Sequence, residues 1–347
     1  MIRYKAQGKG RSGEGSSNGT SESNMGKGHD NEQPSTKLQK HLYLVLDDWD
    51  KGFTIRKIDA DSPDDLVLTD EPPVLRLLSP GRIHCMSFAA MGSSRIIAAS
   101  NEHPATLVYD TEAAGLTTGP PVPAALQDGC AIFLPAADGT LYTVPTVDWS
   151  WRSVVPSPFA RKERVCSCAA HPDGRTVFMS ALTTTSLADR HFRTLSFYAG
   201  SREWTCHGEW GLPFMDNGYF DGYLDAWVGL DEDGYVSACQ VADPTPASGL
   251  KMQQHDRKIA KDKLWSRERR AAQRPTLTCM GHGRFCLVDC VVRQGMKSGY
   301  PDGCMLNITT FRLRYSRKGE LRIADHATRS CQMTKNVRAF SPVAFWM

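Results

Sequence analysis

Residues 228–239 read Val-Gly-Leu-Asp-Glu-Asp-Gly-Tyr-Val-Ser-Ala-Cys, two short apolar runs separated by an Asp-Gly dipeptide. Such a dipeptide between apolar runs is a strong hairpin signal, because the tight turns that match strand twist need positive φ at both central residues. The same arrangement surrounds Asp138-Gly139 and Asp173-Gly174, and other Asp-Gly dipeptides begin at Asp128, Asp221 and Asp302. The chain is therefore predicted to consist largely of β-hairpins.

A second repeated unit is a strand that ends in a polar turn, as in 106–111 and in 195–200, where Trp204 and Trp210 follow. A tyrosine, a polar turn and then a tryptophan is typical of the outer strands of a kelch-type blade. Together the two units give candidate blades near residues 42–60, 83–122, 129–155, 165–212, 223–242 and 276–323. Their spacing of about 40–50 residues matches propeller repeats.

Radial stacking of four-stranded sheets buries their apolar faces and leaves only short edges. We therefore predict an all-β, kelch-like β-propeller of about six blades over residues 41–347. The alternative is a double β-sandwich, although about 300 residues is long for one sandwich. Most tryptophans near the strand ends are expected to pack between blades, because they supply large buried areas.

Residues 1–40 are rich in Gly, Ser and Asn and have almost no apolar side chains, so we predict a disordered tail. This start contains no apolar segment, and no run in the chain reaches the roughly 18 apolar residues of a membrane span, so we expect neither a secretory signal nor membrane association. The eleven cysteines are scattered through apolar runs, which is typical of buried thiols in a reducing compartment. We expect a cytoplasmic and/or nuclear protein.

Residues 251–270 interrupt the β pattern, because they contain no Gly or Pro and carry eight Lys or Arg against three acids. We predict an exposed helix or flexible insertion between two blades. The candidate interaction residues in it are Arg257, Lys258, Lys261, Lys263, Trp265, Arg267, Arg269 and Arg270. Its basic side chains could contact phosphates, and Trp265 could stack on a base. The segment could also be a nuclear localisation signal, but a solvated loop is the favoured interpretation.

The sequence contains no recognisable motif for catalysis, metal binding or cofactor binding. Cys286 and Cys290 would lie about 13 Å apart on one strand face, too far to share a zinc ion. Cys166 and Cys168 have only His171 nearby, so core thiols are the better interpretation. No Gly-x-Ser-x-Gly sequence follows a predicted strand as a nucleophile elbow requires, since the match at residues 15–19 lies in the tail. The Gly-Lys-Gly sequences of the tail lack the Ser or Thr of a phosphate-binding loop. We therefore predict no catalytic residues, no metal and no cofactor.

The stretch from Cys279 to Cys290 resembles a recurrent segment of a grass-expanded family of plant proteins of unknown function, which has kelch-like or F-box-associated propeller character. Residues 107–112, followed by Gly115-Leu116 and Gly119-Pro120, resemble a second hallmark of that family, and so does the opening 42–45. The resemblance covers roughly residues 40–345. It implies a propeller and carries no catalytic or binding residues, and the tail lacks the helical periodicity of an F-box.

The sequence thus favours a non-catalytic protein-interaction scaffold with an unidentified protein partner. The alternative is a nuclear, nucleic-acid-associated protein that uses residues 251–270, and the third hypothesis is an enzyme on a propeller scaffold. The formal net charge of +3 is too small to indicate a polyanion partner by itself. The sequence does not indicate an oligomeric state.

Overall fold

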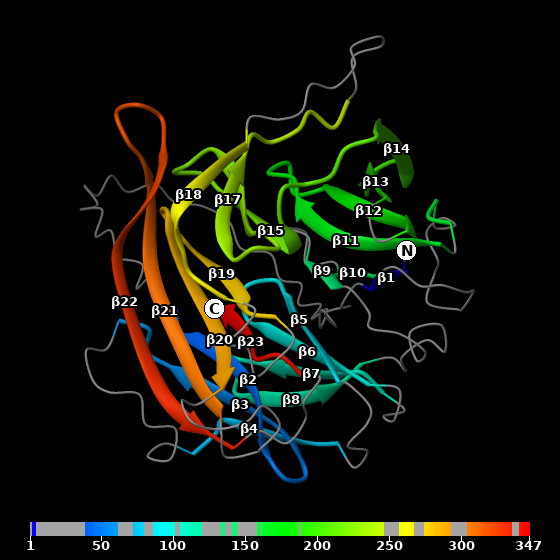
Figure 1. The fold of residues 1–347 in the computed structure, drawn as a ribbon. Coiled ribbons are helices and arrows are strands. Elements are labelled where there is room, and N and C mark those ends of the chain that lie inside the picture. Colours follow the sequence, from blue (N-terminus) through cyan, green and yellow to red (C-terminus); the bar gives the residue numbers. More distant parts are fainter. Residues whose placement is uncertain are drawn as a thin grey trace, which may run out of the picture.

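The computed structural model describes residues 2–4, 39–61, 72–79, 86–100, 105–119, 133–135, 141–143, 158–160, 162–186, 189–245, 257–266, 274–292, 304–334 and 340–347. All regular elements in these ranges are β-strands, and their sheets are arranged around a common centre (Figure 1). The predicted all-β class is confirmed. The same ranges contain no helix with the length and apolarity needed to cross a membrane.

Four blades consist of four strands in chain order, and each strand is antiparallel to its neighbours within the blade. Blade two contains β5 (Ser87–Met91), β6 (Arg95–Ala99), β7 (Leu107–Asp110) and β8 (Gly115–Thr118). Blade four contains β11 (Glu163–Ala170), β12 (Thr176–Ser186), β13 (Asp189–Tyr198) and β14 (Glu203–Gly208). Blade five contains β15 (Met215–Asp221), β16 (Ala226–Leu230), β17 (Tyr235–Cys239) and β18 (Arg257–Lys263). Blade six contains β19 (Thr276–Gly281), β20 (Arg284–Val292), β21 (Cys304–Tyr315) and β22 (Leu321–Met333).

Blade one joins the two ends of the propeller. Its strand order is β23 (Val343–Trp346), β2 (Leu42–Trp49), β3 (Gly52–Ile58) and β4 (Leu75–Leu78), so the last strand of the chain pairs with the first strand of the domain. The pairing runs from Leu42 opposite Trp346 to Val45 opposite Val343. Two backbone hydrogen bonds between His41 and Met347 extend it. This closure turns a row of sheets into a ring and removes two raw sheet edges.

Blade three is described only in part, by β9 (Phe133–Pro135) and β10 (Leu141–Thr143). With this partial sheet, the described residues form six blades of a β-propeller, which agrees with the predicted number of about six. Of the tail that we predicted to be disordered, residues 2–4 form a strand, β1 (Ile2–Tyr4), which pairs with β10. Residues 1 and 5–38 of that segment lie outside the described ranges.

The Asp-Gly turns explain the hairpins locally. Gly174 and Gly234 have φ of 69° and 94°, the left-handed conformation that glycine adopts without strain. In the first of these turns, the Asp173 carboxylate accepts hydrogen bonds from the amides of Arg175 and Thr176 at 2.8 Å. At Asp221-Gly222 the turn is different, because Asp225 carries the positive φ of 48°. The dipeptides at 128, 138 and 302 lie outside the described residues.

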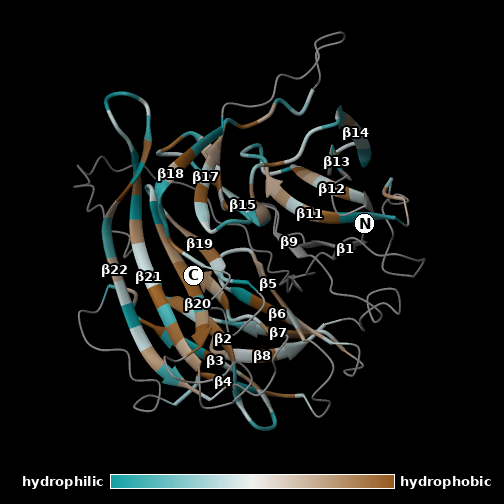
Figure 2. Ribbon diagram, viewed as in Figure 1, coloured by the Kyte–Doolittle hydropathy of each residue, from teal (hydrophilic) through white to brown (hydrophobic). Residues whose placement is uncertain are grey.

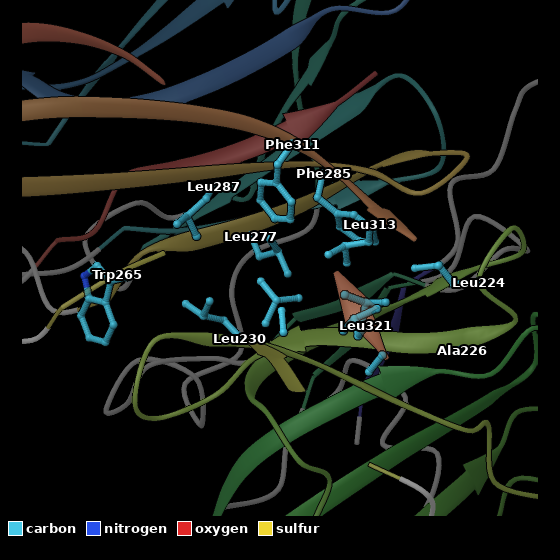
Figure 3. Close-up of a cluster of buried hydrophobic side chains, with 14 residues drawn as sticks. Leu224, Ala226, Leu230, Trp265, Leu277, Phe285, Leu287, Phe311, Leu313 and Leu321 are labelled. Atoms are coloured by element: carbon cyan, nitrogen blue, oxygen red, sulfur yellow. The ribbon is translucent and has the colours of Figure 1, made fainter. Parts of the chain in front are cut away.

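The hydrophobic core is distributed between neighbouring blades. Trp227 is fully buried with Phe178 and Phe214 between blades four and five, and its Nε1 donates to the Ala170 carbonyl at 2.8 Å. This confirms the expected role of the tryptophans for Trp227. A larger cluster joins blades five and six and contains Val228, Phe285 and neighbouring aliphatic side chains (Figure 3). Burial of such side chains between sheets holds the blades together.

The segment 251–270 is not the predicted helix or insertion where the structure describes it. Arg257–Lys263 forms β18, the outermost strand of blade five, and pairs antiparallel with β17. The composition favours a helix, but the edge of β17 offers a row of unsatisfied backbone groups, and tertiary pairing overrides a weak local propensity. Residues 251–256 and 267–270 lie outside the described residues.

Candidate functional site

β18 holds the basic side chains that the sequence singles out. In the ladder, Arg257 lies opposite Cys239 and Ile259 lies opposite Ser237. Ala260 is almost completely buried and joins the cluster between blades five and six, whereas most other β18 side chains are exposed. The strand therefore has one small apolar anchor and a charged outer surface, which is typical of a protected edge strand.

The four basic residues of β18 make different contacts. The Arg257 guanidinium donates to the buried carboxylate of Asp231 at 2.9 Å, so it anchors the strand to its own blade. The Lys258 ammonium lies 4.7 Å from the centre of the Tyr315 ring, and Lys261 lies 3.5 Å from the carboxylate of Glu320. Tyr315 and Glu320 belong to the β21–β22 hairpin, so two of the four residues face blade six.

The fourth basic residue of β18, Lys263, lies over the ring of Tyr235 in its own blade, with its ammonium 5.7 Å from the ring centre. This contact is a cation–π interaction at the far end of β18 from Lys258. We therefore do not group Lys263 with the side chains that face blade six.

Trp265 does not have the predicted role. Its side chain is 6% exposed and belongs to the cluster between blades five and six (Figure 3). Its amide donates to the Gly234 carbonyl, so the residue folds back against the β16–β17 turn. A buried ring cannot stack on a base. The prediction of a stacking tryptophan is therefore wrong, and Arg267, Arg269 and Arg270 lie outside the described residues.

The sequence reasoning missed a second source of positive charge, the β21–β22 hairpin. Its strands are the longest of the propeller's described strands, and its hydrophilic tip extends beyond the neighbouring strands (Figures 1 and 2). Arg314 and Arg322 lie directly opposite each other in the ladder, and Arg317 and Lys318 are exposed in the turn between them. The signal was present in residues 311–322, which read FRLRYSRKGELR.

The exposed basic side chains of β18 and of this hairpin lie at the outer edge of blades five and six, and we call them the basic patch. Arg314 and Arg322 extend from the face of the hairpin opposite Tyr315 and Leu321, which is the face turned away from blade five. The two outermost strands, β18 and β22, lie side by side although they belong to different blades. The patch consists of Lys258, Lys261, Arg314, Arg317, Lys318 and Arg322, with Asp262 and Glu320 as its acidic members. Among the described residues, Arg314, Arg317 and Lys318 have no carboxylate within 4.0 Å.

Polar groups on the innermost strands form a separate cluster. Asp221 is 2% exposed, and its Oδ2 accepts a hydrogen bond from the Gly283 amide of blade six at 2.9 Å. Its Oδ1 accepts from the amides of Tyr223 and Leu224 in its own turn at 3.1 and 3.0 Å. The carboxylate is thus a link between blades five and six, and its acceptor sites are occupied by protein donors.

The thiols near this link are not activated. Cys168 donates to the side-chain oxygen of Asn217 at 3.0 Å, and burial raises its pKa well above the usual value. Burial also raises the pKa of Cys279 to about 11. Thiolates are the nucleophilic and metal-binding form, so these groups are protonated and unreactive near neutral pH. Within the described part of the chain, no three His, Cys, Asp or Glu side chains are grouped to hold a metal ion.

One serine–histidine pair has the distance of a nucleophile and its base. Ser196 Oγ and His207 Nε2 lie 2.7 Å apart, but both side chains are buried and the imidazole packs against the Phe178 ring. A nucleophile must reach its substrate. The pair therefore belongs to the internal packing of blade four.

A family model described as "Protein of unknown function (DUF1668)" matches residues 39–148 and 145–332. No curated protein matches the chain. Similar solved structures include a nidogen/laminin complex, with 9% identity, coverage of 89% of this chain and 98% of that chain, and a TM-score of 0.46. TolB from Acinetobacter baumannii shows 11% identity, coverage of 88% and 66%, and a TM-score of 0.34. An oligogalacturonate lyase with manganese shows 10% identity, coverage of 83% and 74%, and a TM-score of 0.33. Since these scores are below 0.5, the fold assignment depends on the strand order and ring closure of this chain.

Proposed function

Because this chain belongs to the DUF1668 family of proteins of unknown function, we propose a function from its own geometry: a non-catalytic scaffold that binds another protein through the basic patch. The observation that supports this proposal most directly is the unbalanced charge of the patch. Six basic side chains and two carboxylates gather there, whereas the whole chain has a formal net charge of only +3. The rest of the chain therefore carries no net positive charge.

The position of two arginines strengthens the argument. Arg314 and Arg322 are direct cross-strand neighbours, and their side chains extend to the same face of the hairpin. Like charges directly opposite each other destabilise a sheet. Glu320 neutralises Arg322 at 2.8 Å, but Arg314 has no such neighbour among the described residues. Such an arrangement costs folding stability, and an anionic partner would offset that cost.

The inner strands favour binding over catalysis. The Asp221 carboxylate is occupied by backbone amides, and the nearby thiols are held in their protonated form. Ser196 and His207 are enclosed by the packing of their own blade. A catalytic centre needs polar groups that can reach a substrate and change protonation state near neutral pH. In the described residues, exposed unsatisfied charge gathers on the outer surface instead.

Nucleic-acid binding is the second candidate function, and the positive charge of the patch is the observation in its favour. Two features weigh against it. Trp265 is buried, and the ring faces of Tyr315 and Tyr235 are already occupied by lysine ammonium groups. A single-stranded nucleic acid would therefore find no free aromatic ring among these residues on which to stack a base.

We also propose the finer assignments that the sequence suggests, namely kelch-like blade character, a plant source, and a location in the cytoplasm and/or nucleus. The tyrosine–turn–tryptophan units support the first, and the resemblance of residues 279–290 supports the second. The cysteine distribution supports the third. Imaging of a fluorescently tagged full chain would test the location, and secretion of the tagged protein would contradict it.

Affinity purification of the full chain, followed by lysine-directed cross-linking, tests the scaffold proposal. We expect a protein partner in stoichiometric amount, with cross-links at Lys258, Lys261 or Lys318. The R314E/R317E/K318E variant reverses three charges of the patch, and it should lose the partner and keep the fold. Recovery of no specific protein, together with turnover of a metabolite by the purified chain, would contradict the proposal.

A further inference from the structure

The face of blade six that is turned away from blade five carries four arginines, Arg284, Arg312, Arg314 and Arg322, which we call the arginine face. Arg284 lies directly opposite Arg312 in the ladder of β20 and β21, and Arg314 lies directly opposite Arg322 in the ladder of β21 and β22. Arg312 and Arg314 are two positions apart on β21, so they point to the same side of the sheet. Cross-strand neighbours have Cβ atoms about 4.5–5.5 Å apart, so the four side chains start from one compact area.

The neighbouring core residues identify this side of the sheet independently. Phe285 and Leu313, which alternate with the arginines, belong to the cluster between blades five and six. Cys286, two positions after Arg284, belongs instead to the cluster shared with blade one. The Arg284 guanidinium also contacts the carboxylate of Asp61, which follows β3 of blade one. The arginine face is therefore the side of blade six that is turned toward blade one.

Positive charge exceeds negative charge in this area. Three of the four arginines each contact one carboxylate, from Asp61, Asp325 and Glu320 respectively. Those three arginine side chains are still between 33% and 55% exposed, so solvent reaches them. The fourth, Arg314, is exposed and has no carboxylate within 4.0 Å among the described residues. The hairpin turn adds Arg317 and Lys318, so six basic side chains and three carboxylates give this area a net charge of +3.

This chemistry suits phosphate better than a further carboxylate. A guanidinium has five N–H donors in a planar fork, which matches the oxygens of either group. Arg312 and Arg322 already have carboxylate partners from this chain, so a monovalent ligand would gain little beyond Arg314. A phosphorylated side chain carries a charge of about −1.5 to −2 and three acceptor oxygens. It can therefore accept hydrogen bonds from Arg314 and from the remaining donors of both neighbours, and it offsets most of the excess charge.

We propose that the arginine face binds a phosphorylated serine or threonine side chain of a partner protein, with Arg314 at the centre and Arg312 and Arg322 on either side. This inference rests on the proposed scaffold function and specifies the chemistry of its partner. The phosphate lies where Arg314 and Arg322 face each other, so it relieves the repulsion between these two like charges. Its contacts are charge-assisted hydrogen bonds, which are the strong class.

A nucleic acid fits the arginine face less well. The carboxylates of Asp61, Asp325 and Glu320 lie among the arginines, and each would repel the neighbouring phosphates of a continuous backbone. The whole chain has a formal net charge of +3, equal to that of this area, so the rest of the chain has no net charge to hold a long polyanion. A single phosphate group avoids both difficulties.

The test is fluorescence anisotropy with a labelled ten-residue peptide of Gly and Ala that contains one central phosphoserine. The full chain should bind this peptide at least tenfold more tightly than the same peptide with serine, which corresponds to about 1.4 kcal/mol. Arg314→Ala should abolish the preference, and Arg314→Lys, which keeps the charge and loses the fork, should restore only part of it. The matched control is Arg175→Ala, which removes an exposed arginine of blade four and should change the affinity less than twofold.

Two further measurements separate phosphate recognition from other roles of Arg314. The affinity of the full chain should fall between pH 7.5 and pH 5.5, because the second pKa of a phosphorylated side chain is about 6 and the dianion is the expected ligand. Arg314 is exposed, so Arg314→Ala should keep the wild-type midpoint of thermal unfolding. A lower midpoint with unchanged affinity for the phosphopeptide would assign Arg314 a structural role and overturn the inference.

Other outcomes also decide against the inference. Equal losses in Arg314→Ala and Arg175→Ala would show that only the total charge matters. Tighter binding of a ten-nucleotide single-stranded DNA than of the phosphopeptide, with the same sensitivity to Arg314→Ala, would identify a nucleic-acid surface. Tighter binding of inositol hexakisphosphate would identify a small-molecule site. If the full chain ignores the phosphopeptide but still recovers a protein partner, the inference fails and the scaffold proposal stands. If it recovers no partner either, both fail.

Discussion

Replacement of Asp221 by alanine should destabilise the propeller through one buried contact between blades. The carboxylate accepts the Gly283 amide of blade six and the amides of Tyr223 and Leu224 in its own turn. The side chain is 2% exposed, so water cannot readily replace it. Asp221→Ala therefore leaves a buried donor of blade six without an acceptor.

The size of this loss follows from the number and burial of the donors. A buried donor left without a partner costs about 1–3 kcal/mol. Loss of a carboxylate that caps neighbouring amides costs about 1 kcal/mol more. We expect Asp221→Ala to lower the free energy of unfolding by about 3 kcal/mol. Because each kcal/mol lowers the midpoint of thermal unfolding by about 2–4 °C, that midpoint should fall by roughly 6–12 °C.

Asp110→Ala is the matched control. Asp110 also accepts two turn amides, from Glu112 and Ala113 at 3.0 Å, but its side chain is 27% exposed and makes its contacts within blade two. We expect a loss of about 1 kcal/mol for this variant. Thermal and urea unfolding, followed by circular dichroism, measure both. If Asp221→Ala costs no more than Asp110→Ala, the link between blades five and six contributes nothing and the reasoning is refuted.

Three further predictions concern single residues. Gly234→Ala should destabilise by at least 3 kcal/mol, because its Cβ would lie 2.0 Å from a backbone carbonyl. Gly92→Ala, where φ is 67° and nothing lies within 4 Å, should cost only about 1 kcal/mol in urea unfolding. In mass-spectrometric labelling with iodoacetamide at pH 8, exposed Cys206 should react in the native protein. Cys286, whose pKa burial raises to about 12, should react only after unfolding. The Ala113 amide lowers the pKa of Asp110, so the stability that its carboxylate provides should be present above about pH 4 and lost as the pH falls through the folded-state pKa. Urea titrations of Asp110→Asn against wild type from pH 6 to 3 would measure this as a shrinking difference.

The sequence was sufficient for features that depend on neighbouring residues. The hairpins at Asp173-Gly174 and Asp233-Gly234 were predictable because a tight turn and two apolar runs specify a hairpin with no help from the rest of the chain. The spacing of these units gave a propeller of about six blades. The ring closure is different, since Val343–Trp346 pairs with Leu42–Val45 from the far end of the chain. No local pattern in either segment predicts that the two strands pair with each other.

The sequence-based prediction was wrong where contacts with a distant part of the chain determine the local structure. Residues 257–263 contain good helix formers, and only the free edge of β17 makes them a strand. Trp265 illustrates the same limit, because the segment 251–270 around it is rich in charged residues while its surroundings in the fold are apolar. A tryptophan beside lysines in sequence suggested base stacking. In three dimensions it closes the end of a hydrophobic cluster.

The basic patch depends on the propeller itself. Lys258 and Arg314 are separated by more than fifty residues, so no local pattern in the sequence places them at the same edge of the fold. The ring places the outermost strands of blades five and six side by side, and the cluster around Phe285 and Val228 fixes their spacing from within. A surface built in this way exists only in the folded ring. Its affinity for an acidic partner should therefore respond to substitutions such as Asp221→Ala, which alter no charge of the patch and loosen the contact between its two blades.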